Sequence, residues 1–120
     1  MSDWTYHNSV EDKPLVWLQG EIKTPPFSAQ ARLKAGFLLR LLQEGENLSM
    51  PDPMPMPSIG PDCHELRIVD GNVGWRIAYY LAANAIVILD VFKKKSQKTP
   101  KKFLEAARSR LRAYRKLMED

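Results

Sequence analysis

The stretch AIVILDVFKKKSQKTP, residues 85–100, organises the rest of the chain. Its first eight residues, Ala85 to Phe92, form an apolar run rich in branched side chains. Such a run is typical of a strand buried on both faces and is too short to span a membrane. Four lysines and then a helix start follow directly: Lys93, Lys94, Lys95 and Lys98, then Thr99-Pro100. We therefore predict a central strand that delivers cations to one edge of a sheet, where they either hold an anion or only keep the strand end solvated.

The charge of the chain is unevenly distributed. The 120 residues carry a net charge of +4 and fit a single domain with one core. Residues 93–118 hold eleven basic residues and one acid, Glu105, so the rest of the chain is acidic. A basic end on an acidic body indicates a polyanion or an acidic protein as partner.

The cysteine content and the N-terminus restrict the class of protein. Cys63 is the only cysteine, so the chain can form neither an internal disulfide nor a four-cysteine metal site. The first thirteen residues contain no basic segment followed by an apolar one, which argues against a signal peptide. We expect a cytoplasmic protein with no membrane partner, no metal and no cofactor, and we expect residues 1–13 to be loosely held.

The first half of the chain predicts a strand, a helix and a long loop. LVWLQGEIK (15–23) alternates imperfectly and is a first strand bent at Gly20. Ser28 is a good N-cap for an amphipathic helix that runs to the C-capping Gly45 and is weakest near Gly36. Residues 46–62 contain five prolines, which predicts an extended loop without regular structure, with its methionines laid against the core.

The second half predicts three strands and a helix. Residues 63–69, 75–81 and 85–92 form an antiparallel meander because short turns join them. Residues 100–118 form a strongly basic amphipathic helix with proline in its first turn. The fold class is α+β: a small antiparallel sheet of about four strands packed against an N-terminal helix or helical hairpin, with a C-terminal helix.

Strand parity places two arginines on one face of the meander. Alternate residues of a strand share a face, so Glu65 and Arg67 lie together, as do Arg76 and Tyr80 on the next strand. If the opposite, apolar faces turn to the helices, both arginines come out beside the lysine-bearing strand end. Two guanidinium groups and a lysine cluster suit a phosphodiester, although each arginine alone is more simply a surface residue.

Other candidate side chains also have a structural interpretation. Glu65 is either the ion-pair partner of an arginine or a base, and Tyr80 is able to stack on a nucleobase. His64 falls on the apolar side and is better explained as a structural histidine than as a catalytic one. Trp17 and Trp75 are most simply core residues.

The order and spacing of several segments resemble the RelE/ParE superfamily of type II toxins, and within it the HigB-like, phage-derived branch. The resemblance covers roughly residues 17–114. It rests on GEIKTPPFS (20–28), AGFLLRLLQEGE (35–46), PMPSIGPDCHELRI (55–68), WRIAYY (75–80) and IVILDVFKKKSQKTPKKFLEAARSRL (86–111).

This resemblance implies a strand, a helical hairpin, a three-stranded antiparallel meander and a C-terminal helix, which together make a RelE-like fold. It also implies a ribosome-dependent mRNA endonuclease (an mRNA interferase) that needs no metal and lets the 2′-hydroxyl of the RNA attack the adjacent phosphate. The implied partners are the ribosome, mRNA and a cognate antitoxin with a helix-turn-helix DNA-binding fold.

The resemblance also implies roles for individual residues. Arg67 and Arg76 match arginines that hold the phosphate, and Lys94 and Lys95 match a lysine pair after the last strand. Relatives place a histidine or tyrosine there as the acid, whereas this chain offers a lysine, Glu65 or Tyr80. Further phosphate contacts are expected from basic residues at the strand end and on the helix: Lys93, Lys98, Lys101, Lys102 and Arg108.

Two other functions fit parts of the same pattern. The first is a ParE-like inhibitor that binds DNA gyrase through the lysine surface and does no chemistry. The second is an inactive phage remnant that only binds nucleic acid. The convergence of arginines on one face favours the nuclease, because a gyrase binder does not need to gather them around one phosphate.

Overall fold

The structure, a computed structural model, describes residues 12–46, 53–94 and 99–119. The expectation of a loosely held N-terminus falls mostly outside these ranges, and so do the predicted site residues Lys95 and Lys98.

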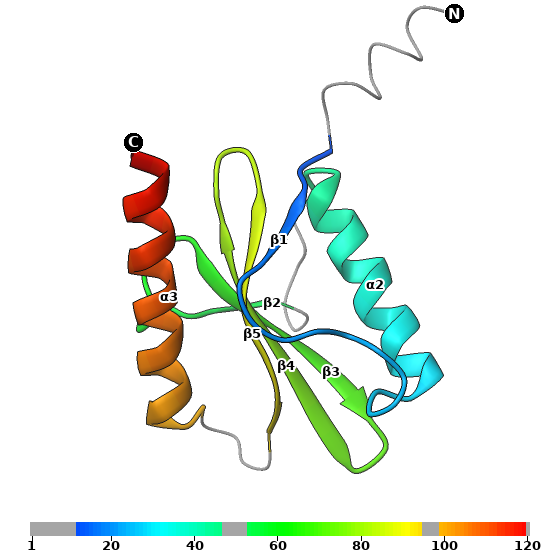
Figure 1. The fold of residues 1–120 in the computed structure, drawn as a ribbon. Helices are drawn as coiled ribbons and strands as arrows, with labels where there is room; N and C mark the ends of the chain where they lie inside the picture. The colour runs from blue at the N-terminus through cyan, green and yellow to red at the C-terminus, as the bar shows by residue number, and fades with distance from the viewer. Residues whose placement is uncertain (1–11, 47–52, 95–98, 120) are drawn as a thin grey trace, which may run out of the picture.

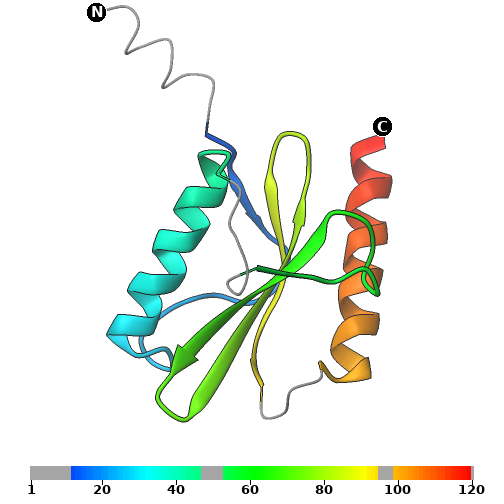
Figure 2. The same cartoon turned by 180° about the vertical axis from the view of Figure 1, so that it is seen from behind.

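The core of the fold is a five-stranded mixed sheet with a helix on each side (Figures 1 and 2). The strand order is β1-β5-β4-β3-β2, where β1 pairs with β5 in parallel and the other neighbours are antiparallel. The strands are β1 (Leu15–Trp17), β2 (Pro53–Pro55), β3 (Cys63–Asp70), β4 (Val73–Leu81) and β5 (Ile86–Lys94). The predicted α+β class and the antiparallel meander are confirmed.

Helix α2 (Ala29–Gln43) covers one face of the sheet (Figure 1). It begins where predicted, because the Ser28 hydroxyl accepts a hydrogen bond from the Ala31 amide at 3.0 Å. Gly45 follows its end with a φ of +88°, the left-handed conformation that favours glycine. The helix runs through Gly36 without a break, so the described residues contain a single helix here rather than a helical hairpin.

Helix α3 (Lys101–Glu119) covers the opposite face, so the two sides of the sheet carry separate cores (Figure 2). Leu66, Ile77 and Ile88 pack with the buried stripe of α2. Ala78, Val87 and Leu89 pack with α3, together with Ile59 and Met56 from the proline-rich segment. The β5 run is therefore buried on both faces, as predicted. No helix among the described residues is long and apolar enough to cross a membrane.

Three predictions about the N-terminal half are wrong. The first strand ends at Trp17 instead of reaching residue 23, because the chain bends at Leu18 and Gln19. Gly20, whose φ is +88°, then lies so close to β5 that an added Cβ would be 2.8 Å from the Val91 Cβ. As a consequence, Trp17 lies at the sheet edge with 42% of its surface exposed and is not a core residue. The proline-rich segment also contains a strand, β2, which prolines allow because it lies at the edge and pairs on one side only.

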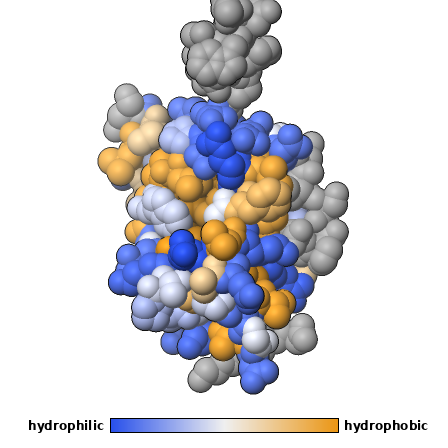
Figure 3. Space-filling view, turned by 90° about the vertical axis from the view of Figure 1, so that its right-hand side faces the viewer, coloured by the Kyte–Doolittle hydropathy of each residue, from blue (hydrophilic) through white to orange (hydrophobic). Residues whose placement is uncertain are grey.

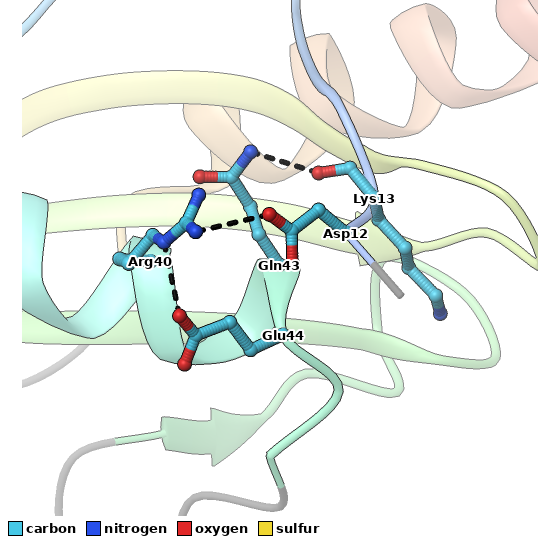
Figure 4. A network of polar contacts seen from close by, with 5 residues as sticks. All are labelled: Asp12, Lys13, Arg40, Gln43 and Glu44. Carbon is cyan, nitrogen blue, oxygen red and sulfur yellow. Dashed lines mark hydrogen bonds and ion pairs between the residues drawn. The ribbon is translucent and has the colours of Figure 1, made fainter. Parts of the chain in front are cut away.

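Polar contacts attach the start of β1 to the end of α2 (Figure 4). The Arg40 guanidinium lies 2.9 Å from the Asp12 carboxylate and 3.0 Å from that of Glu44. The backbone N–H of Lys13 donates to the Gln43 carbonyl at 2.8 Å, and the Gln43 side-chain amide donates to the Lys13 carbonyl at 2.8 Å. Strand β1 and helix α2 are therefore held side by side.

Candidate functional site

A β-bulge decides which lysine of β5 enters the site. The pairing of β4 with β5 shifts between Ala78 and Tyr79, so that Ala78 opposes Asp90 while Tyr79 opposes Ile88. Leu89 is the extra residue, and the alternation of β5 reverses after it. Lys94 therefore points to the α3 side of the sheet, whereas Lys93 lies over the Trp75 ring on the α2 side at 5.6 Å.

The centre of the site is a buried ion pair between neighbouring strands. Glu65 on β3 and Arg76 on β4 lie on the α3 side, with Glu65 Oε1 3.3 Å from Arg76 Nε. Their side chains are 1% and 10% exposed. Arg76 Nε has no aligned hydrogen bond, so the contact is an ion pair rather than a charge-assisted hydrogen bond. The prediction that this arginine face is open to solvent is thus wrong for Arg76.

Thr99 joins this pair to the end of β5. Its hydroxyl is buried and donates to Glu65 Oε2 at 3.1 Å, and the Lys94 ammonium donates to the same hydroxyl oxygen at 3.3 Å. Thr99 lies two residues before the start of α3, in whose first turn Phe103 stacks on Phe92 of β5 with ring centroids 4.2 Å apart. Sequence reasoning used Thr99 only as a helix start and missed its place in the site.

Arg67 completes what we call the charged cluster, which consists of Glu65, Arg67, Arg76, Lys94 and Thr99. Arg67 is directly opposite Arg76 in the β3–β4 register and is half-buried. No described residue forms a hydrogen bond or ion pair with it. Three cations face one carboxylate here, so the cluster carries an excess of two positive charges.

The electrostatics of the charged cluster shift two pKa values. Burial, and then the neighbouring Arg76 guanidinium, lower the pKa of Lys94 below the ordinary lysine value of 10.5, while Glu65 opposes the shift. Burial and the repulsion from Arg67 likewise lower the pKa of Arg76. Burial is the larger cause of both shifts, and the repulsion between the neighbouring cations adds to it, so an anion bound beside them would favour their charged forms.

The remaining predicted site residues lie elsewhere. Tyr80 shares the face of the charged cluster but sits four residues further along β4, where the Arg115 guanidinium covers its ring at 4.9 Å. Arg108 is bound to the Ser58 carbonyl at 2.7 Å, which ties α3 to the proline-rich segment. Lys101 and Lys102 are exposed in the first turn of α3, near the cluster in sequence but not among its contacts.

His64 has the structural position that its parity predicts. It is on the α2 side and stacks on Tyr79 with centroids 5.6 Å apart. Among the described residues its buried Nδ1 has no hydrogen-bond partner. It lies on the opposite face from the charged cluster and takes no part in it.

A pocket of about 870 Å³ lies between α2 and residues 15–22. It is on the opposite side of the sheet from the charged cluster. The charge arrangement, not a cavity, therefore identifies the charged cluster as the candidate site.

A comparison with known protein families places most of the chain in one family. Residues 25–112 match the family described as "Phage derived protein Gp49-like (DUF891)", and no curated protein matches the chain. The matched range contains α2, the whole charged cluster and most of α3. It covers well over half of the chain, and the family is toxin-like, of the RelE/HigB type. The chain therefore belongs to the Gp49-like family of phage-derived proteins.

Proposed function

We propose that this protein is the toxin of a type II toxin-antitoxin system, of the HigB-like branch, and that it cleaves mRNA on the ribosome. The observation that carries the proposal is the convergence of Arg67, Arg76 and Lys94 around a single carboxylate. Family membership supports a toxin-like function.

The reaction class sets the requirements for the site. In metal-independent RNA cleavage the 2′-oxygen forms a bond to phosphorus while the bond from phosphorus to the 5′-oxygen breaks. A base takes the 2′-hydroxyl proton, an acid protonates the leaving 5′-oxygen, and cations stabilise the phosphorane. The phosphorane carries two negative charges, which the two excess positive charges of the charged cluster would balance.

The geometry favours different roles for the members of the cluster. Arg67 is the more accessible of the two arginines in the cluster and would contact the phosphate directly. Lys94 is suited to donate the proton to the leaving oxygen, because its lowered pKa makes it a stronger acid than a free lysine. Glu65 is too deeply buried to reach a 2′-hydroxyl, so we assign it a positioning role on Arg76 and Thr99. The other members of the cluster are cations and a threonine, so the 2′-hydroxyl proton would pass to water.

The proposed partners follow from the proposed activity. The substrate is mRNA in the ribosome, where ribosomal RNA would help to position it, and the exposed Lys101 and Lys102 in the first turn of α3 would bind its phosphates without sequence preference. A cognate antitoxin, a small helix-turn-helix DNA-binding protein, would silence the toxin in the cytoplasm.

The proposal is tested by primer extension on a reporter mRNA after brief induction of the protein in cells. We expect cuts inside the reading frame that disappear when translation of the reporter is blocked. Arg67→Ala should reduce cleavage by about a hundredfold, the typical effect of removing one group that stabilises transition-state charge. Arg112→Ala removes an exposed arginine from α3, outside the cluster, and should retain cleavage.

Arg76→Ala is a poor choice for this experiment because it would leave the Glu65 carboxylate buried without its partner and endanger the fold. The circular dichroism spectrum of purified Arg67→Ala must match that of the wild-type protein, which shows that the variant keeps the fold. Intact reporter mRNA in growth-arrested cells would contradict the nuclease and indicate the gyrase-inhibitor alternative.

The ion pair itself favours a second candidate function. Glu65 already neutralises Arg76, which is the arrangement expected of a retained structural pair in an inactive remnant that only binds nucleic acid. Intact mRNA without growth arrest, together with salt-dependent RNA binding by the purified protein, would favour this alternative.

A further inference from the structure

The residues around Arg76 form a grid on the α3 side of strands β3, β4 and β5, because the side chains on this face follow the strand register. Its inner, middle and outer rows are Glu65, Ala78 and Asp90; Arg67, Arg76 and Phe92; and Val69, Gly74 and Lys94. The inner row is buried, whereas Val69 in the outer row is 82% exposed. The outer row is next to the turn that joins β3 to β4, and this turn lies away from α3 in Figures 1 and 2. The grid therefore opens at its outer row.

The inner and middle rows close off much of the Arg76 side chain. Glu65 Oε1 lies 3.3 Å from Arg76 Nε, and this nitrogen is buried. Phe92, directly opposite Arg76 on β5, is buried and stacks on an aromatic ring of α3. Ala78, the next residue of β4 on this face, is also buried. The approach to the guanidinium that is left to a ligand passes Arg67 and the outer row.

Gly74, at the centre of the outer row, leaves a gap beside the guanidinium. An added Cβ at Gly74 would lie 3.7 Å from Arg76 Nη1 and 3.7 Å from the Lys94 carbonyl oxygen, which are ordinary contacts. The φ of Gly74 is outside the left-handed region, so neither packing nor backbone conformation requires glycine here. The register with Val69 and Lys94 is regular, so no bulge explains it either. Glycine in the interior of a regular strand is typical of a place that a ligand approaches closely.

Three cations border this gap, and both carboxylates of the grid lie away from it. The cations are Arg67, Arg76 and Lys94. Glu65 and Asp90 belong to the inner row, on the far side of Arg76 from Gly74. The opposite face of the molecule has a different character, since Figure 3 shows apolar surface gathered between hydrophilic regions on the α2 side. The gap is therefore suited to a small anion, and guanidinium groups bind phosphate oxygens well.

We propose that Gly74 is a positioning residue of the charged cluster, and that its missing side chain is the opening through which an RNA phosphate reaches Arg76 Nη1. The phosphate would lie over the Gly74 backbone, between Arg67 and Lys94. The geometry of the grid carries the anion site, whereas the identification of the anion as an RNA phosphate rests on the proposed function. Gly74 acts through the access that it gives to Arg76 and takes no part in the chemistry.

The test measures the binding of inorganic phosphate to the full chain at constant ionic strength. Proton–nitrogen NMR correlation spectra follow the Nε–H signal of Arg76, which we expect to shift saturably in the wild-type protein. Gly74→Val should weaken the phosphate affinity about tenfold, the effect of losing one hydrogen bond to a charged group. Gly74→Ala should weaken it less, because its Cβ only contacts Arg76 Nη1.

Gly36→Val is the matched control. It makes the same substitution on α2, on the other side of the sheet, where an added Cβ meets nothing within 4 Å, so it should bind phosphate like wild type. Thermal unfolding checks the fold, and Gly74→Val should unfold at no lower temperature than wild type because branched residues favour strands. If valine lowers the midpoint temperature, Gly74→Ala decides the test, since its added Cβ makes ordinary contacts.

The outcomes separate this proposal from the proposed nuclease. An Arg76 signal that phosphate does not shift, or equal phosphate affinity in the wild type and the Gly74 variants, would overturn the opening even if the reporter mRNA is cut. An equal loss of affinity in Gly36→Val would overturn it as well. Phosphate binding that depends on Gly74, in a protein that leaves the reporter mRNA intact, would support the opening and contradict only the nuclease.

Discussion

The buried pair of Glu65 and Arg76 gives a stability prediction that can be worked from its geometry. At 3.3 Å and an effective dielectric constant of 20, the attraction between the two charges is about 5 kcal/mol. The desolvation of two nearly buried ions offsets most of it, so the intact pair adds little net stability. Removing one partner leaves the desolvation of the other uncompensated, which typically costs about 3 to 5 kcal/mol.

We expect Arg76→Met to lower the free energy of unfolding by about 3 kcal/mol, the low end of that range, because Thr99 still donates to the Glu65 carboxylate. Glu65→Leu should cost about 2 kcal/mol, since Arg76 is slightly more exposed than Glu65 and reaches water more easily. The double variant should lie within about 1 kcal/mol of wild type, which gives a coupling free energy of about 5 kcal/mol.

Urea unfolding, followed by circular dichroism, measures the free energy of unfolding of the wild type, the two single variants and the double variant. With a slope of about 1.5 kcal/mol per molar urea, the Arg76→Met midpoint should fall by about 2 M. A double variant whose loss equals the sum of the single losses would show that the two side chains do not interact in solution. It would also remove the basis for assigning Glu65 a positioning role.

Two further predictions concern α2 and its start. Gly36→Ala should raise the free energy of unfolding by about 1 kcal/mol, because alanine is the better helix former and its Cβ meets no neighbour. Thermal unfolding measures this effect, and a midpoint temperature equal to or below that of wild type would contradict it. Hydrogen bonds from the Ser28 amide and the Trp75 indole lower the pKa of Asp70 below 3.8, so its contribution to stability is present above pH 3.8 and is lost as the pH falls through the lowered value. The difference in urea midpoint between wild type and Asp70→Asn should therefore shrink between pH 5 and pH 2, and a constant difference would contradict this origin.

The sequence predicted the elements with strong periodic patterns. The meander, the helix capped by Ser28 and the basic C-terminal helix appear within one or two residues of their predicted limits. Their signals are local, since side-chain spacing, caps and turn residues determine them. The sequence did not predict strand β2. This strand depends on the pairing of Met54 with Glu65 at the sheet edge, and the prolines of the segment indicate a loop instead.

The candidate site was harder to predict because its geometry depends on contacts between distant segments. The alternation of side chains along β3 and β4 correctly placed Glu65, Arg67 and Arg76 on one face of the sheet. Strict alternation along β5 from Leu89 would have put Lys93, instead of Lys94, on that same face. The bulge that exchanges the two lysines has no marker such as glycine in IVILDVF. Sequence spacing also could not show that α3 would cover the arginine face and bury Arg76.

The charged cluster and the start of α3 form one structural unit. Thr99 binds Glu65 of β3 and accepts from Lys94 of β5, and two residues later α3 begins. A substitution that removes the Glu65 carboxylate therefore alters both the charge around Arg76 and the attachment of α3. Arg67 is different, because no described residue forms a hydrogen bond or ion pair with it. Arg67 is thus the position where a loss of activity can be separated most cleanly from a loss of structure.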